Sequence, residues 1–286
     1  MNRYFAFGLN IQSDFKIPEL LLSQFSITNP DLEIKASLTL DGLSDNYIGN
    51  HVEANKNQLY LHLENIANFL IENGNRITYQ RTAHVSDEEL RLFILGSCLG
   101  CILQQRGYIV LHGNAITTDE KTCKIIVGHQ GAGKSTTAAW HYLQGAKILA
   151  DDVCAITFNE QGVPMVIPSY PQIKLWQASA DLLGISTQSL RRVRPQDEKF
   201  AVPIEKQFWQ TPLPLTEVTE ISQTNSENNP IQGANKLALL IQHSYRYYFL
   251  EKMQLTTEYI KKILLLANQI KMQSTPRINL AQKIHA

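Results

Sequence analysis

Short apolar runs bounded by Pro, Asn, Asp and Gly dominate the first part of the chain, and this pattern is typical of strands. We expect strands over residues 4–9, 32–40, 59–63 and 76–80, and a short helix over 66–70. The segment therefore predicts a small β-rich unit, and it carries no recognisable chemistry.

A helical pattern follows this β-rich segment. Ser86 and Glu89 form a capping box, and the apolar residues after them recur at the spacing of a core-facing helix that ends near residue 105. We therefore place the domain boundary here, with residues 1–85 as an N-terminal unit and 86–286 as a second domain.

Short strands and helices then alternate along the second domain. Strands are expected over residues 108–111, 114–117, 124–127, 147–150, 154–158 and 164–167. Helices are expected over residues 135–143, 175–183, 234–250 and 256–270. Between them, residues 185–233 are polar and Pro-rich, with a loop over 222–233. The succession predicts an α/β domain closed by C-terminal helices.

Charge and composition exclude several classes of protein. The 26 basic and 26 acidic residues give zero net charge, whereas a dedicated nucleic-acid binder usually has a basic excess. No stretch of about 18 apolar residues occurs, and the N-terminus lacks the apolar segment of a signal peptide. We expect a cytoplasmic protein with neither a nucleic acid nor a membrane as partner. Cys98 and Cys101 form a C-x-x-C pair, but no second cysteine or histidine pair completes a zinc site. We expect all four cysteines to be reduced core residues.

The most informative segment is Gly-His-Gln-Gly-Ala-Gly-Lys-Ser-Thr over residues 128–136, which matches the phosphate-binding pattern G-x-x-x-x-G-K-[ST]. An apolar strand precedes it and a helix follows it, as that pattern requires. Glycines allow backbone N–H groups to approach phosphate oxygens, and the N-terminus of the helix adds partial positive charge. The predicted nucleotide-binding residues are Gly128, Gly131, Ala132, Gly133, Lys134, Ser135 and Thr136.

Lys134 would reach the outer phosphates, and the Ser135 hydroxyl would bind Mg²⁺. A carboxylate at the end of a neighbouring strand usually completes such a magnesium site. Asp151 and Asp152 follow the strand expected over 147–150. Adjacent residues of a strand point to opposite sides, so one carboxylate would face the metal and the other the nucleophile. A competing interpretation is that one of the two only caps a turn.

His112 also ends a predicted strand, where it could orient an aspartate, although a lone histidine is more often structural. Asn235 and Lys236 lack the following Asp of the guanine-reading N-K-x-D pattern, so ATP is favoured over GTP as the nucleotide. Basic residues between 191 and 199 either contact phosphate or form a solvated loop face, of which the second is the commoner case.

Three segments together resemble the C-terminal kinase domain of HPr kinase/phosphorylase and the related phosphoenolpyruvate carboxykinase fold. They are Leu-His-Gly at 111–113, the loop at 128–135 and Ile-Leu-Ala-Asp-Asp at 148–152. Residues 5–13, 168–176 and 200–203 further resemble HPr-kinase-like proteins encoded with ribosomally made peptides, including lasso peptide kinases.

The resemblance implies an α/β P-loop core of this type, behind a β-rich N-terminal unit and followed by C-terminal helices. It implies that Asp151 is the base on a serine hydroxyl, close to His112, and that Asp152 helps to place Mg²⁺. It also implies a precursor peptide as partner, phosphorylated on its C-terminal serine. HPr kinases form hexamers, so the resemblance makes a homo-oligomer possible, although no feature of this sequence corresponds to that interface. HPr itself is disfavoured as substrate, because no second glycine-rich signature is found.

Two other functions stay open at this point. A kinase of a small metabolite would use the loop over 222–233 and the N-terminal unit to close a compact pocket. A regulatory module would bind ATP without transferring phosphate, and would be indifferent to the loss of Asp151.

Overall fold

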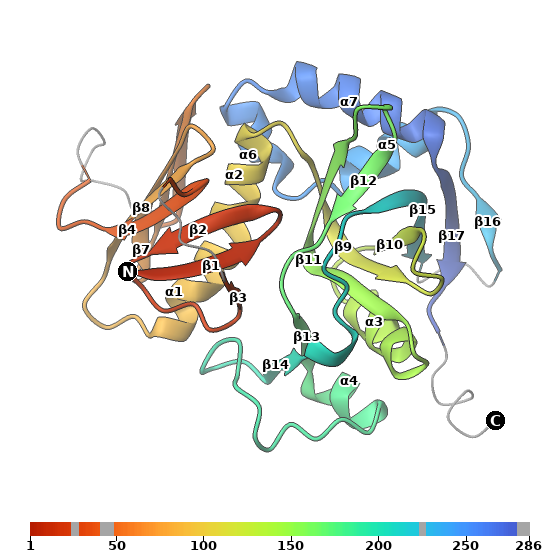
Figure 1. Cartoon of the computed structure of the whole chain (residues 1–286), viewed down its shortest axis with the longest axis horizontal. Helices are drawn as coiled ribbons and strands as arrows, with labels where there is room; N and C mark the ends of the chain where they lie inside the picture. The colour runs from red at the N-terminus through yellow and green to blue at the C-terminus, as the bar shows by residue number, and fades with distance from the viewer. Residues whose placement is uncertain (24–28, 41–48, 223–226, 279–286) are drawn as a thin grey trace. The chain divides into compact units, whose positions relative to one another are not determined.

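The computed structural model describes residues 1–23, 29–40, 49–222 and 227–278. The chain forms two compact units (Figure 1), of which the first combines Met1–Ile109 with Arg246–Lys261 and the second combines Val110–Tyr245 with Lys262–Ala286. The boundary expected after residue 85 falls inside the first unit, because the helical segment that follows it packs on the strands that precede it.

An eight-stranded sheet forms most of the first unit, in the order β3-β1-β2-β4-β8-β7-β6-β5. Its strands are β1 Asn2–Ala6, β2 Leu9–Ser13, β3 Leu21–Leu22, β4 Leu32–Ala36, β5 His51–Asn55, β6 Gln58–Leu63, β7 Ala67–Glu72 and β8 Arg76–Arg81. The helix expected over 66–70 is wrong: this segment is β7, whose residues alternate between buried and half-buried. The strand expected over 4–9 is a hairpin, which turns where Phe7 and Gly8 both have positive φ.

The helical segment of the first unit is continuous, as predicted. It comprises α1 (Asp87–Phe93), a π-helical turn (Ile94–Cys98) and α2 (Leu99–Gln105). Ser86 caps α1, since its hydroxyl accepts the Glu89 backbone N–H at 3.2 Å.

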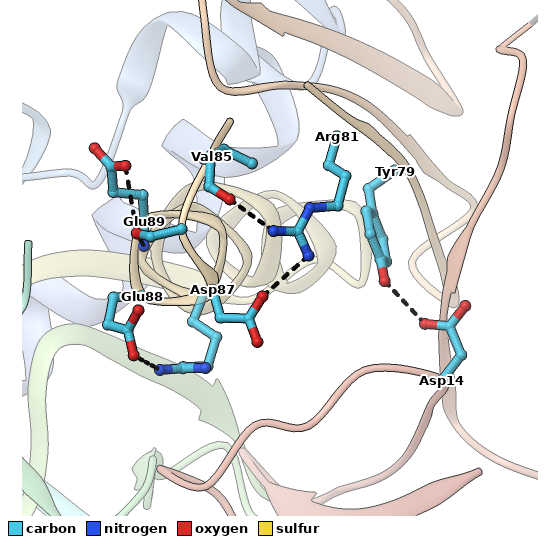
Figure 2. A network of polar contacts seen from close by, with 9 residues as sticks. Asp14, Tyr79, Arg81, Val85, Asp87, Glu88 and Glu89 are labelled. Carbon is cyan, nitrogen blue, oxygen red and sulfur yellow. Dashed lines mark hydrogen bonds and ion pairs between the residues drawn. The ribbon is translucent and has the colours of Figure 1, made fainter. Parts of the chain in front are cut away.

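Polar contacts anchor the start of α1 to the sheet. In Figure 2, Arg81 lies between the Val85 carbonyl and the Asp87 carboxylate, at 2.6 and 3.0 Å. Tyr79 donates to Asp14 in the same network. The Arg81 contacts connect β8 to the start of the helix, and the Tyr79 contact connects β8 to the residue that follows β2.

A seven-stranded sheet forms the centre of the second unit, in the order β10-β9-β11-β12-β15-β17-β16, with a further pairing of β10 with β15. Its strands are β9 Ile109–Thr117, β10 Cys123–Val127, β11 Lys147–Phe158, β12 Pro164–Ile167, β15 Leu213–Ser222, β16 Asn229–Pro230 and β17 Lys271–Pro276. The sequence did not predict β15, which lies in the polar region and runs parallel to both β10 and β17.

A two-stranded ribbon and several helices complete the second unit. The ribbon pairs β13 (Gln172–Trp176) with β14 (Lys199–Pro203). The helices that lie wholly in this unit are α3 Lys134–Leu143, α4 Gln177–Leu182 and α5 Ala234–Gln242. The helix expected over 234–250 is therefore two, with α6 (Tyr247–Lys252) in the first unit, and α7 (Thr256–Gln269) agrees with the prediction. Part of the loop expected over 222–233, residues 223–226, lies outside the described residues.

The four cysteines are free and buried, as expected of core residues. In the part of the chain that the structure describes, no helix is both long and apolar enough to cross a membrane.

β9 is one strand where two were expected, and it passes straight through His112 and Gly113. A Cβ atom at Gly113 would lie 2.5 Å from the carbonyl oxygen of Ile126 in β10. Only glycine allows this approach, so Gly113 sets how closely the strand that carries His112 packs on the strand that leads into the glycine-rich loop.

We predict that Gly113→Ala destabilises the protein by about 1–3 kcal/mol, because the new methyl group meets backbone that cannot move aside. Gly162→Ala is the comparison, since Gly162 has positive φ but open space around it and should cost about 1 kcal/mol from conformation alone. Chemical denaturation measures both. A Gly113→Ala variant as stable as the wild type would contradict the close approach of β9 and β10.

Candidate functional site

The residues predicted to bind nucleotide and metal meet around a cavity of about 250 Å³ in the second unit. Eight of the ten predicted site residues line it: His112, Gly131, Gly133, Lys134, Ser135, Thr136, Asp151 and Asp152. Gly128 and Ala132 pack within the loop instead, where a Cβ atom at Gly128 would lie 3.1 Å from that of Ala132.

The glycine-rich loop joins β10 to α3. Gly131 and Gly133 have φ of 79° and 99°, a left-handed conformation that glycine adopts without strain. Gly133 is the residue before α3, so the unpaired backbone N–H groups of the first helical turn and the positive end of the helix dipole lie at the cavity.

Lys134, the first residue of α3, folds back over the loop. Its Nζ donates to the carbonyl oxygens of Gly128 at 2.8 Å and His129 at 3.2 Å. Burial lowers the pKa of this ammonium, although the nearby carboxylate of Asp152 opposes the shift. These two hydrogen bonds hold the Lys134 ammonium against the first residues of the loop.

Asp151 and Asp152 lie in the middle of β11, although the sequence predicted that the strand ends before them. Both line the same cavity, whereas an extended strand would direct them to opposite faces. The reason is local: Asp152 has φ of 72°, which interrupts the alternation. Aspartate tolerates this left-handed conformation better than most residues.

Asp151 is 3% exposed and accepts hydrogen bonds from three uncharged donors. Its Oδ1 accepts from the Asn114 side-chain amide and, at 3.1 Å, from the Ser135 hydroxyl. Its Oδ2 accepts the backbone N–H of Lys174 at 2.9 Å. Burial raises the pKa of Asp151, and the neighbouring Lys174 ammonium only partly opposes this.

Asp152 contacts two cationic or basic side chains instead. Its Oδ2 lies 2.9 Å from Lys174 Nζ, and its Oδ1 lies 3.1 Å from His112 Nδ1. Burial would raise the pKa of Asp152, but the Lys174 ammonium and the His112 hydrogen bond outweigh it and hold the pKa well below its usual range. Asp152 is therefore ionised at neutral pH.

The partner of His112 thus differs from the one that the family resemblance implied. The imidazole contacts Asp152 and not Asp151, because His112 is a half-exposed residue of β9 and Asp152 is the less buried of the two acids. Asp151 is the acid that contacts Ser135.

Sequence reasoning missed Asn114 and Lys174. Asn114 lies two residues after His112 on the same face of β9, so a polar pair at i and i+2 in an apolar strand was the available signal. Lys174 lies between Ile173 and Leu175 in β13, where a predicted helix over 175–183 concealed the strand.

Lys199 from β14 also lines the cavity. It lies directly across the ribbon from Trp176, with its Nζ 5.7 Å from the centre of that ring. The sequence placed Lys199 in a basic cluster that favoured a solvated loop face. Its neighbours Arg191, Arg192 and Arg194 do not line this cavity, so only Lys199 of the cluster belongs to the site.

No family model matches the chain, and no curated protein matches it. Among solved structures, the chain is similar to the Hpr(Ser) kinase/phosphatase from Coxiella burnetii, with 11% sequence identity and a TM-score of 0.32. The similarity covers 61% of this chain and 85% of that one. A likeness at this level does not establish a family, so the interpretation of the site depends on the chain's own residues.

We predict that Lys174→Met destabilises the protein by about 3 kcal/mol at pH 7, because it leaves the Asp152 carboxylate without its closest cation. The folded-state pKa of Asp152 is depressed, so the stability that the pair contributes is present above the unfolded pKa of about 4 and is lost as the pH falls toward the folded value.

The difference in unfolding free energy between wild type and variant should therefore narrow between about pH 5 and pH 3, which chemical denaturation at each pH measures. A difference that does not change over this range would contradict an ion pair between Lys174 and Asp152.

Proposed function

We propose that this protein is an ATP- and Mg²⁺-dependent kinase that transfers a phosphoryl group to a serine hydroxyl of a peptide. The observation that carries the proposal is the placement of two unlike carboxylates beside a glycine-rich loop. Asp151 is joined to Ser135 of the loop's helix, and Asp152 is joined to His112 and Lys174.

The charge of the cavity supports a polyphosphate as ligand. Four cationic side chains line it, namely Lys134, Lys174, Lys199 and Arg277, against the two carboxylates Asp151 and Asp152. An excess of positive charge, together with the free N–H groups of the first turn of α3, favours binding of a strongly anionic group.

We assign the metal to Ser135 and Asp151. Mg²⁺ prefers oxygen ligands and is commonly held by one or two protein oxygens together with substrate phosphates. The Ser135 hydroxyl and the Asp151 carboxylate provide two such oxygens, 3.1 Å apart. The hydrogen-bond donors to Asp151 among the described residues are uncharged, so a divalent cation would compensate its buried charge. Bound Mg²⁺ would neutralise charge on the phosphates during transfer.

We assign the proton acceptor to Asp152. Lys174 and His112 already compensate its charge, and they fix its orientation from two sides. With about a quarter of its side chain exposed, Asp152 remains accessible to an acceptor hydroxyl. These assignments exchange the two roles that the family resemblance gave to Asp151 and Asp152.

The reaction then proceeds with a simple exchange of bonds. The serine oxygen forms a bond to the γ-phosphorus of ATP, and the bond from that phosphorus to the oxygen bridging the β- and γ-phosphates breaks, which releases ADP. The hydroxyl proton passes to Asp152. Phosphoryl transfer has a loose transition state, in which positioning matters more than a strong base, so an ionised carboxylate that is held in place by two partners can accept the proton.

A peptide acceptor with a C-terminal serine is the finer part of the proposal, and it is supported by the sequence resemblance to lasso peptide kinases. A kinase of a small metabolite would use the same residues with a different acceptor in place of the peptide. A regulatory module without transfer is disfavoured, since it would not need an ionised Asp152 at the cavity in addition to the metal-site carboxylate.

We predict that Asp152→Asn lowers phosphoryl transfer by about 10³-fold while MgATP binding stays within about threefold of the wild type. Asp151→Asn should instead weaken binding of MgATP more than binding of metal-free ATP, because it removes a metal ligand. Intact mass spectrometry of peptides ending in serine, incubated with protein, ATP and Mg²⁺, measures transfer, and calorimetry measures binding.

Lys271→Gln is the control, since Lys271 is an exposed residue of β17 that does not line the cavity. If Asp152→Asn keeps its transfer activity and Asp151→Asn leaves the effect of Mg²⁺ on ATP binding unchanged, the assignment is wrong.

A further inference from the structure

One cation of the cavity comes from the far end of the chain. β10, β15 and β17 are mutually parallel, so their carboxyl ends lie at the same edge of the sheet. The carboxyl end of β10 leads into the glycine-rich loop, and the carboxyl end of β17 leads into Arg277. Arg277 therefore reaches the loop although about 145 residues of sequence separate the two.

Arg277 lies against the last glycine of the loop. A Cβ atom at Gly133 would be 3.3 Å from Arg277 Nε and 3.8 Å from its Cγ and Cδ atoms. Glycine at this position therefore leaves room for the arginine side chain to cross the loop immediately before α3. The guanidinium lines the same cavity as Lys134 and Ser135.

No residue that the structure describes forms an ion pair with Arg277. A guanidinium stays charged at every relevant pH, and its planar array of donors matches phosphate oxygens in a bidentate manner. Lys134, Lys174 and Lys199 line the same cavity and carry the same charge as Arg277. Arg277 is an exposed residue, so its guanidinium is available to an anion that enters the cavity.

We propose that Arg277 is a phosphate-binding residue, which contacts the phosphate chain of the nucleotide from the side of Gly133. This inference rests on the proposed function, since it requires a nucleotide phosphate at the loop. It adds a fifth segment to the site, after β9, the loop, β11 and the β13–β14 ribbon.

Arg277→Gln tests the inference, because glutamine keeps the Cγ and Cδ atoms that pack on Gly133 and removes only the charge and the fork of donors. The variant and the wild type are each titrated with MgATP and with MgADP in a calorimeter. The variant should bind MgATP about 10- to 100-fold more weakly than the wild type does. Arg277→Lys should recover part of the loss, and Lys271→Gln, which removes one charge from the strand that leads into Arg277, should bind as the wild type does.

The melting temperature of the protein without nucleotide separates binding from packing. Arg277 forms no ion pair with the residues that the structure describes, so Arg277→Gln should melt within about 1–2 °C of the wild type or above it. A variant that binds MgATP as tightly as the wild type would overturn the inference and leave the proposed function intact. A variant that binds weakly but also melts well below the wild type would show a packing role and would likewise overturn it. A wild type that binds neither MgATP nor MgADP would overturn both proposals.

Discussion

The left-handed backbone of Asp152 is the constraint on which the site depends. A regular strand would direct Asp151 and Asp152 to opposite faces of the sheet, and one of them would then lie away from the glycine-rich loop. With φ of 72° at Asp152, both carboxylates line one cavity. Such a conformation costs free energy of the order of 1–3 kcal/mol, and it persists because the surrounding structure holds it. Lys174 contributes to this directly, since its backbone N–H binds Asp151 and its ammonium binds Asp152.

The same lysine makes the two adjacent acids chemically different. Asp152 has two compensating partners, Lys174 and His112, and its pKa is depressed, whereas Asp151 accepts neutral donors and its pKa is raised. Pairs of titratable groups whose surroundings drive their pKa values apart are characteristic of sites that assign two roles to two similar residues. In the proposed function, this difference separates the acid assigned to the metal, Asp151, from the acid whose charge is already compensated, Asp152.

Much of the site could be predicted from local sequence, and the reasons are physical. The loop over 128–136 has a fixed spacing because glycines, lysine and hydroxyl contact one phosphate chain, so it is visible without a structure. The capping box at Ser86 and the hairpin between β11 and β12 are equally local. What failed was the side on which each aspartate lies and the partner of His112. The positive φ of Asp152 decides on which side each aspartate lies, and the pairing of β9 with β11 decides which acid contacts His112. Neither feature produces a periodic pattern in the sequence.

Residues contributed by distant segments were the hardest to predict. β15 separates β10 from β17, yet it lies in a polar, Pro-rich region that gave no strand pattern. Without β15 there is no reason to place Arg277 near the loop. The sequence shows Lys199 as one member of a basic cluster. Its place at the cavity follows from the pairing of β14 with β13, which sets Lys199 opposite Trp176.

A crystal structure with Mg²⁺ and a non-hydrolysable ATP analogue would test the central claim most directly, because it locates the metal relative to both acids. We predict that the metal binds the Ser135 hydroxyl on the side of Asp151, and that the Asp152 carboxylate, still paired with Lys174 and His112, faces the γ-phosphate. A metal bound to Asp152, with Asp151 directed toward the γ-phosphate, would contradict the division of roles proposed for the two carboxylates.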